Sequence, residues 1–275
     1  MSGNKEQIDY WSGQAGDVWV AQQTRLDSQL APLGLAAMAA LSPSRGEVIG
    51  DIGCGAGQTT QQLTERVAPD GRALGVDVST PLLALAKKRF STISFTEADA
   101  ATHTFPEKLD AIFSRFGVMF FVDPVAAFTN LASQLRPGGR LAFVCWRAPA
   151  ENPILTLPME AAVKAGVPKP PSSDDPFAPG PFAFADKERT TGILEKAGFK
   201  DVSLAPHDER IGGNDLNGAL ELALHVGPFG RMLREAPQYR DVSIAAIREA
   251  LAPFETGGMV MLPSATWIAT ARVGG

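Results

Sequence analysis

A run of three alternating glycines behind an acidic residue, Asp51-Ile52-Gly53-Cys54-Gly55-Ala56-Gly57, constrains the fold of this chain more than any other feature. It follows the apolar, strand-like segment Val48–Ile52 and precedes Gln58–Val67, where we expect a helix. Glycine is needed where φ is positive or where the backbone approaches a ligand closely. A strand, a glycine loop and a helix in this order are typical of a pocket for a nucleoside-bearing cofactor.

Strand-like and helix-like segments alternate from about residue 47 to residue 146. The expected strands are Val48–Ile52, Arg72–Val78, Ile93–Ala98, Ala111–Ser114 and Arg140–Trp146. Ser79 and Asp123-Pro124 are typical helix starts, and Pro137-Gly138-Gly139 is a typical helix stop. This alternation predicts a parallel sheet with helices on both faces.

The C-terminal half has a different pattern. A Pro-rich stretch with one expected helix at Leu157–Ala165 is followed by expected strands at Asp201–Ala205 and Ala265–Arg272, and the helical segment Asp215–Leu251 lies between these strands. We therefore expect an N-terminal helical lid over residues 1–42, a cofactor-binding core over 43–148, a Pro-rich insertion over 149–185, and the rest of the core over 186–275 with a helical acceptor-site insertion at 213–255.

Composition narrows the class of protein. The net charge of −5 over 275 residues argues against a nucleic-acid binder, which would need a basic face. The polar N-terminus does not resemble a secretory signal, and no run reaches the roughly 18–20 apolar residues of a membrane span. Cys54 and Cys145 lie far apart, and with three histidines they form no recognisable metal-ligand spacing. We expect a cytoplasmic, metal-independent protein.

Acidic residues end the first three expected strands. Asp51 ends the first, Asp77 the second and Asp99 the third. A single aspartate there is usually a helix cap or a turn residue, but three on one sheet edge favour a ligand, because ligands bind at the carboxyl ends of parallel strands. Asp77 can accept both hydroxyls of a ribose, and Asp99 can accept from the exocyclic amine of adenine.

These segments together resemble the class I S-adenosylmethionine-dependent methyltransferases, in the broad subgroup that includes the ubiquinone/menaquinone-biosynthesis C-methyltransferases. The matching segments are Asp51–Gly57, Gly75–Ser79, Glu97–Ala100, Leu109–Phe116 and Leu135–Leu141. The likeness covers about residues 47–146, with a weaker likeness over 186–205. It implies an α/β fold with a Rossmann-like, seven-stranded, mostly parallel sheet whose last strand is antiparallel, helices on both faces, and a helical lid or insertion.

The resemblance also implies S-adenosylmethionine as cofactor and S-adenosylhomocysteine as product. In this family Asp77 would bind ribose, Asp99 and the Ala100 backbone would hold adenine, and the Ser114 carbonyl would meet the methionine ammonium. The residues implied for the cofactor are Asp51, Gly53, Cys54, Gly55, Gly57, Asp77, Val78, Leu82, Asp99, Ala100, Ser114, Arg115 and Phe116.

The acceptor side is less defined by the sequence. The candidates are Trp19, Met119, Phe120, Trp146 and His225. His225 is the best candidate base if the helical insertion caps the pocket, and a core or surface histidine is the competing interpretation. The apolar Met119-Phe120-Phe121 stands where the quinone-type relatives carry polar or histidine residues, which argues against a quinone-like acceptor.

The sequence thus predicts a methyltransferase that acts on a small-molecule acceptor at O, N or C by in-line displacement, and it leaves a homodimer open. One rival is a nicotinamide-dinucleotide-dependent oxidoreductase. Gln58 in the sixth motif position and Asp51 before the loop argue against it. The other rival is a non-catalytic cofactor-binding protein of the same fold, which the absence of an obvious base keeps open.

Overall fold

The computed structural model describes residues 4–170 and 175–275. The strands are β1 (Val48–Ile52), β2 (Arg72–Asp77), β3 (Ser94–Glu97), β4 (Leu109–Arg115), β5 (Leu135–Trp146), β6 (Lys200–Asn214), β7 (Glu255–Thr256) and β8 (Met259–Arg272). The helices are α1 (Lys5–Ser12), α2 (Gln14–Ala21), α3 (Gln23–Leu41), α4 (Gln58–Val67), α5 (Thr80–Arg89), α6 (Pro124–Gln134), α7 (Pro153–Lys164), α8 (Lys187–Lys196), α9 (Leu216–His225), α10 (Gly227–Glu235) and α11 (Arg240–Leu251).

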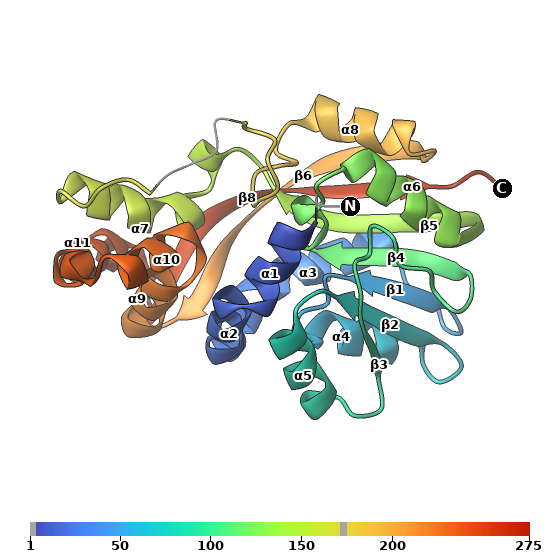
Figure 1. Ribbon diagram of the computed structural model, residues 1–275, viewed down its shortest axis with the longest axis horizontal. Helices are drawn as coiled ribbons and strands as arrows, with labels where there is room; N and C mark the ends of the chain where they lie inside the picture. The colour runs from blue at the N-terminus through green and yellow to red at the C-terminus, as the bar shows by residue number, and fades with distance from the viewer. Residues whose placement is uncertain (1–3, 171–174) are drawn as a thin grey trace.

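One mostly parallel sheet forms the centre of the molecule, with the strand order β3-β2-β1-β4-β5-β8-β6 (Figure 1). Strands β1 to β5 pair in parallel, and β8 runs antiparallel to both β5 and β6. This confirms the expected α/β fold with an antiparallel last strand. Within the described residues the sheet has an eighth member, β7, a two-residue strand that pairs with the start of β8.

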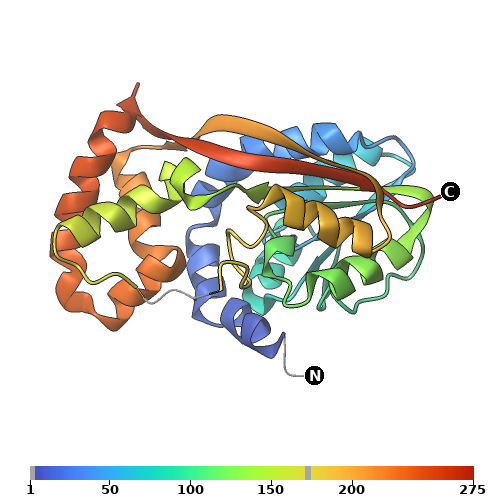
Figure 2. The same cartoon turned by 90° about the horizontal axis from the view of Figure 1, so that it is seen from above.

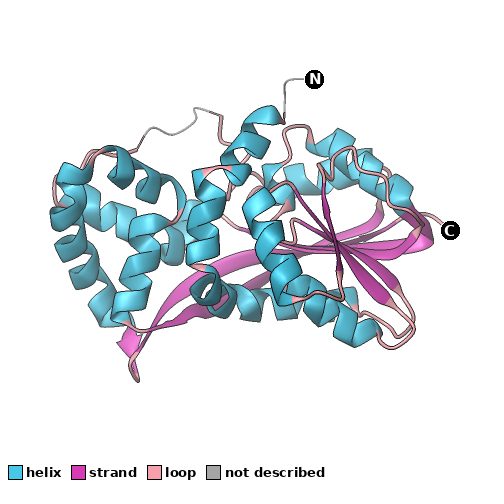
Figure 3. Ribbon diagram, turned by 60° about the horizontal axis from the view of Figure 1, so that its bottom comes forward, coloured by secondary structure: helices cyan, strands magenta, loops and turns pink. Residues whose placement is uncertain are grey.

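Helices cover both faces of the sheet (Figure 3). Helices α3 and α4 contact each other and pack on the central strands, whereas α6 packs with α8, which contacts β6. Local signals explain several boundaries. The Ser79 side chain caps α5 and the Asp123 side chain caps α6, and each helix has proline in its first turn. Among the described residues no helix is both long and apolar enough to cross a membrane.

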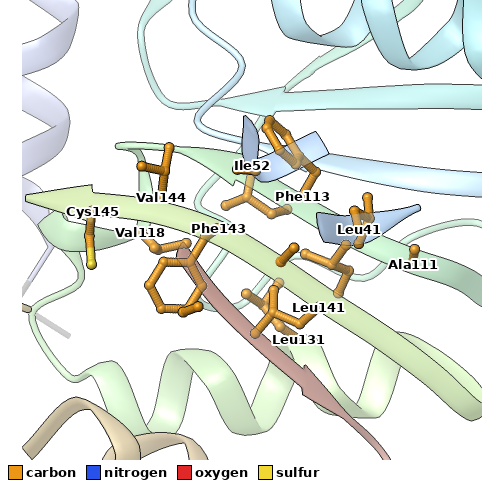
Figure 4. Close-up of a cluster of buried hydrophobic side chains, with 14 of the residues drawn as sticks. Leu41, Ile52, Ala111, Phe113, Val118, Leu131, Leu141, Phe143, Val144 and Cys145 are labelled. Atoms are coloured by element: carbon orange, nitrogen blue, oxygen red, sulfur yellow. The ribbon is translucent and has the colours of Figure 1, made fainter. Parts of the chain in front are cut away.

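The main hydrophobic core lies between the sheet and these helices. Figure 4 shows side chains of β1, β4 and β5 pointing toward Leu131 of α6 and Leu41 of α3. Strand β1 is buried at all five positions, as expected for a strand covered on both faces. The strand therefore does not alternate between apolar and polar residues. The sequence predicts it from its short, mostly apolar run instead.

Strands β6 and β8 extend well beyond the parallel sheet as a two-stranded antiparallel ribbon, which carries helices α7, α9, α10 and α11 (Figure 2). These helices form a second core around Leu220, Leu224, Phe229 and Ile247. We call this part the helical lobe. The predicted lengths of both ribbon strands were wrong, because β6 runs nine residues past Ala205 and β8 starts six before Ala265.

Two further boundaries differ from expectation. Helix α6 ends at Gln134, so Pro137-Gly138-Gly139 does not stop it but lies inside the segment that begins β5, where Gly138 has a φ of +74°. Helix α7 begins four residues earlier than predicted, at Pro153. Proline suits the first helical turn, because it lacks only an N–H that would have no helical partner.

The buried side chain of Asn152 fastens β8 to the start of α7. Its Nδ2 donates to the carbonyl oxygen of Ala265 (3.0 Å) and its Oδ1 accepts from the Ala265 N–H (2.9 Å). The same Nδ2 donates to the carbonyl oxygen of Ala148 (3.1 Å). The Ala265 carbonyl also accepts from the Arg147 N–H (3.0 Å), whereas the Ala265 N–H is paired by Asn152, at the point where β5 no longer runs beside β8.

We predict that Asn152→Ala lowers the free energy of unfolding by about 2 kcal/mol, because it leaves the buried N–H of Ala265 without its side-chain acceptor. Urea unfolding measures this change. The control is Asn217→Ala, at an exposed position whose side chain accepts from Arg248, and it should change stability by about 0.5 kcal/mol or less. A loss below about 1 kcal/mol for Asn152→Ala would contradict the assigned role.

Candidate active site

The glycine loop lies where β1 meets α4, and its backbone requires glycine. Gly53 and Gly55 have φ values of +68° and +53°. A Cβ on Gly53 would lie 2.7 Å from the Cα of Gly117, so the loop after β1 touches the loop after β4. Gly55 is different, because a Cβ there would meet nothing within 4 Å. The loop is therefore packed on one side and open on the other.

Asp51 lies fully buried behind this loop. Its Oδ2 accepts from the hydroxyls of Thr59 and Thr60 (2.7 Å each), and its Oδ1 is buried without a hydrogen-bond partner in the described part of the chain. Burial raises the pKa of Asp51 to about 6, against the lowering effect of the two threonines and of Arg115. An unpaired carboxylate oxygen at this depth suits a cationic group.

The two other acidic residues are held by backbone and side-chain donors. Asp77 accepts from the N–H groups of Gly55 (2.7 Å) and Ser79 (2.8 Å), and burial raises its pKa although part of the residue still faces the cavity. Asp99 accepts from the Ala101 N–H (2.9 Å) and from Nδ2 of Asn4 (2.5 Å). Both carboxylates are thus fixed in orientation at neighbouring strand ends.

A shared ion pair ties the N-terminal helix α3 to the loop region. Asp27 lies 3.0 Å from Arg89 and 3.3 Å from Arg115, and all three side chains are largely buried. Arg115 also donates to Gln58 (2.6 Å), and Arg89 donates to the carbonyl oxygen of Ala56 (2.7 Å). Asp27 therefore joins three segments that are 62 and 88 residues apart in sequence.

Helices α1 and α2 lie across the ends of β2 and β3. The Ser79 hydroxyl donates to the Trp11 carbonyl (2.7 Å), and the Ser12 hydroxyl donates to the Val78 carbonyl (2.8 Å). The Trp11 ring packs edge-on against Trp19 (5.5 Å between centroids) and Phe120 (5.1 Å). These aromatic contacts place the N-terminal helices beside the loop that follows β4.

The glycine loop, Asp77, Asp99 and the aromatic residues of the N-terminal helices line one cavity of about 820 Å³. Phe116 lies in its wall with a φ of +61°, stacked on Trp146 with 4.3 Å between ring centroids. Such backbone strain in a non-glycine residue persists only where the surroundings hold it, and it is common at binding sites. A second hollow of about 370 Å³ lies at the other end of β5, where Arg140 is already paired with Glu47.

Most of the predicted site residues gather on this cavity. Those that line it are Gly53, Cys54, Gly55, Asp77, Val78, Leu82, Asp99, Ala100, Arg115, Phe116, Trp19, Met119, Phe120 and Trp146. Whether each contacts a ligand stays a prediction. Asn4 and Asp27 also line the cavity and were not predicted, because their partners lie far along the chain.

Four predicted residues do not line the cavity in the described part of the chain: Asp51, Gly57, Ser114 and His225. The Ser114 hydroxyl donates to the Ile52 carbonyl (2.7 Å) and accepts from the Gly117 N–H (3.2 Å). Nδ1 of His225 lies 2.8 Å from the Glu221 carbonyl oxygen and 3.2 Å from Glu221 Oε2. The geometry gives His225 a partner in its own helix, and its role as a base stays a prediction.

The raised pKa of Asp51 predicts a pH-dependent stability. An unfolded aspartate has a pKa of about 4, so between about pH 4 and 6 the folded chain keeps a proton that the unfolded chain has lost. The wild type should therefore lose up to about 3 kcal/mol of stability as pH rises through this window. Asp51→Asn cannot titrate and should lack this loss. Urea unfolding from pH 4 to 7 measures it.

The control for this prediction is Asp70→Asn, which removes an exposed carboxylate paired with Arg45 at the surface. Its stability should follow the pH dependence of the wild type. If the difference in free energy of unfolding between Asp51→Asn and the wild type stayed constant from pH 4 to 7, the pKa of Asp51 would not be raised.

Comparison with known proteins agrees with this geometry. Residues 49–139 match a family model described as a methyltransferase domain. Aklanonic acid methyltransferase DauC of Streptomyces sp. (strain C5) is 32% identical over 118 residues, which are 41% of this chain and 54% of the relative. A trans-aconitate 2-methyltransferase of Methylobacterium radiotolerans is 31% identical over 156 residues, which are 57% of this chain and 55% of the relative. The chain thus spans about half the length of these curated relatives.

Solved structures show the same fold at low sequence identity. The YcgJ protein of Bacillus subtilis superposes with a TM-score of 0.57 at 17% identity, over 88% of this chain and 98% of its own. A phosphoethanolamine N-methyltransferase 2 of Haemonchus contortus, in complex with S-adenosyl-L-methionine, has a TM-score of 0.58 at 15% identity, over 100% of this chain and 61% of its own.

The matched segment 49–139 holds the glycine loop and the three acidic strand ends, and the fold around it is shared with solved methyltransferases. In this segment and in its fold the chain resembles the class I S-adenosylmethionine-dependent methyltransferases.

Proposed function

We propose that this chain transfers the methyl group of S-adenosylmethionine to a small-molecule acceptor. The observation that carries the proposal is the arrangement of Gly55, Asp77 and Asp99 around one cavity at the carboxyl edge of the parallel sheet. The solved structure from Haemonchus contortus is a complex with this cofactor, and the curated relatives are named as methyltransferases of aklanonic acid and of trans-aconitate. The net charge of −5 also favours a small acceptor over nucleic acid.

The residues present fit this cofactor. The open side of Gly55 leaves room for a ligand against the loop backbone, and the Asp77 carboxylate, held by two backbone N–H groups, faces the cavity beside it. Asp99 lies at the next strand end. The unpartnered Oδ1 of Asp51 provides negative charge behind the loop for a cationic ligand. Asp77 would hold the ribose, and Asp99 the adenine.

The bound cofactor supplies an already activated methyl group on a sulfonium, so the chain has to align the acceptor and exclude water. The loops after β1 and β4 touch at Gly53 and Gly117 and fix the floor of the cavity. The aromatic cluster of Trp11, Trp19 and Phe120 closes the side next to the N-terminal helices. Aromatic faces also attract a cation such as a sulfonium.

The acceptor atom is O, N or C. A neutral amine needs no base before it attacks the methyl group, whereas a phenol or a carbon acid has to lose a proton. Burial raises the pKa of Tyr10, so this tyrosine in the cavity wall is protonated at neutral pH and serves as a hydrogen-bond donor rather than as a base.

We predict that Asp77→Ala weakens binding of S-adenosylhomocysteine about thirtyfold, which corresponds to about 2 kcal/mol. The expected cause is the loss of charged hydrogen bonds to the ribose, together with looser packing of the Gly55 backbone. Isothermal titration calorimetry gives the affinity. Asp77→Asn keeps the shape and one acceptor oxygen, and should fall between the alanine variant and the wild type.

The control variant is Asp70→Ala, at an exposed position paired with Arg45, and it should bind like the wild type. NADH is the control ligand and should not bind. Tight binding of NADH, or S-adenosylhomocysteine binding indifferent to Asp77, would refute the assignment of the cavity and reopen the dinucleotide alternative.

A further inference from the structure

The cavity extends far beyond the residues assigned to the cofactor. Beyond the stacked pair of Phe116 and Trp146 it continues along the ribbon into the helical lobe. Its walls there are mainly apolar, with Arg231 of α10 as a charged member, and include Ala219, Leu222, Phe229, Leu251, Val260 and Leu262. We call this part the distal chamber. A cavity of about 820 Å³ lies near the upper end of the usual range for small-molecule pockets, about 300–1,000 Å³.

The strand register gives the length of this extension. Trp146 of β5 lies opposite Thr266 of β8, and Asn214 of β6 lies opposite Val260 of β8. Thr266 and Val260 are six residues apart on β8, which is about 20 Å along the strand at roughly 3.3 Å per residue. Asn214 therefore lies well along the ribbon from Trp146, where α9 begins.

Asn214 brings an unsatisfied donor to this apolar wall. Its side-chain Nδ2 is buried and has no hydrogen-bond partner within the described residues, and the residue lines the cavity. The nearby Arg25 approaches α9 at Gly218, but a guanidinium carries donors only and cannot accept from the amide. A buried donor without an acceptor is rare in folded proteins, because leaving it unpaired is costly.

The backbone around Asn214 is fixed. Gly213 before it has a φ of +81°, and the Asp215 carboxylate after it accepts from the Gly218 N–H (2.7 Å) to cap α9. The backbone that carries the amide is thus held in place before any ligand binds.

We propose that Asn214 donates a hydrogen bond to an oxygen at the far end of an elongated, mainly apolar acceptor. This inference rests on the proposed methyl transfer, since it places the reacting end of the molecule near Phe116 and Trp146. The apolar walls bind the body of the acceptor, and Asn214 selects a carbonyl or ether oxygen about 20 Å away along the ribbon. A short polar acceptor would leave the amide unpaired and the walls in contact with water.

The test uses two rod-shaped probes that differ in one oxygen, 4-acetylbiphenyl and 4-ethylbiphenyl. Equilibrium dialysis gives their affinities for the full chain saturated with S-adenosylhomocysteine. The wild type should bind the ketone about tenfold more tightly than the hydrocarbon, as one hydrogen bond to a buried donor allows. In Asn214→Leu the ratio should fall to near one, chiefly through weaker binding of the ketone. Asn214→Asp, which keeps the shape without the donor, should lose the same preference.

Asn217→Ala is the matched control, because Asn217 lies exposed in the first turn of α9 and should keep the tenfold preference. Calorimetric affinity for S-adenosylhomocysteine should be unchanged in every variant. A preference that survives in both Asn214 variants, or failure of both probes to bind a chain that binds S-adenosylhomocysteine, would overturn the inference and leave the proposed function standing. If the chain did not bind S-adenosylhomocysteine but still preferred the ketone, and lost that preference in the Asn214 variants, the proposed function would be overturned and the role of Asn214 would stand.

Discussion

The close approach of two backbone turns is the constraint on which the site depends. Gly53 follows β1 and Gly117 follows β4, and a Cβ on either would come within 3 Å of the other's backbone. Because the two strands are neighbours and parallel, their carboxyl ends can meet only if both turns lack side chains. This contact sets the floor of the cavity. The glycine loop lies on one side of it, and the aromatic residues after β4 lie on the other.

The parallel half of the fold could be predicted because its signals are local. Buried strands such as Val48–Ile52 are short apolar runs, and caps such as Ser79 and Asp123 satisfy backbone groups three residues away. The ribbon was underestimated for the opposite reason. Residues 206–210 are proline, histidine and three charged residues, which favour a loop, yet pairing with β8 holds them extended. Tertiary pairing overrides propensity there.

The same difference between local and long-range signals decides which residues of the candidate site could be predicted. Residues at strand ends, such as Asp77 and Asp99, were found because topology alone brings them to one edge. Asp27 was missed, because its two arginine partners lie 62 and 88 residues away and nothing in the helical pattern of α3 marks it. Asn214 was missed because it lies in the unexpected part of β6. Contacts between residues far apart in the sequence produce no local sequence pattern from which they could be predicted.

The ribbon of β6 and β8 separates the helical lobe from the part of the parallel sheet that carries the glycine loop. The helical lobe has its own core and meets the parallel sheet chiefly through this ribbon and α7. The segment shared with the methyltransferase-domain family ends at residue 139, before either ribbon strand begins. Substitutions in the lobe can therefore accumulate without disturbing the glycine loop. Changes in the lobe can thus reshape the distal chamber, while the glycine loop and the acidic strand ends keep their places on the parallel sheet.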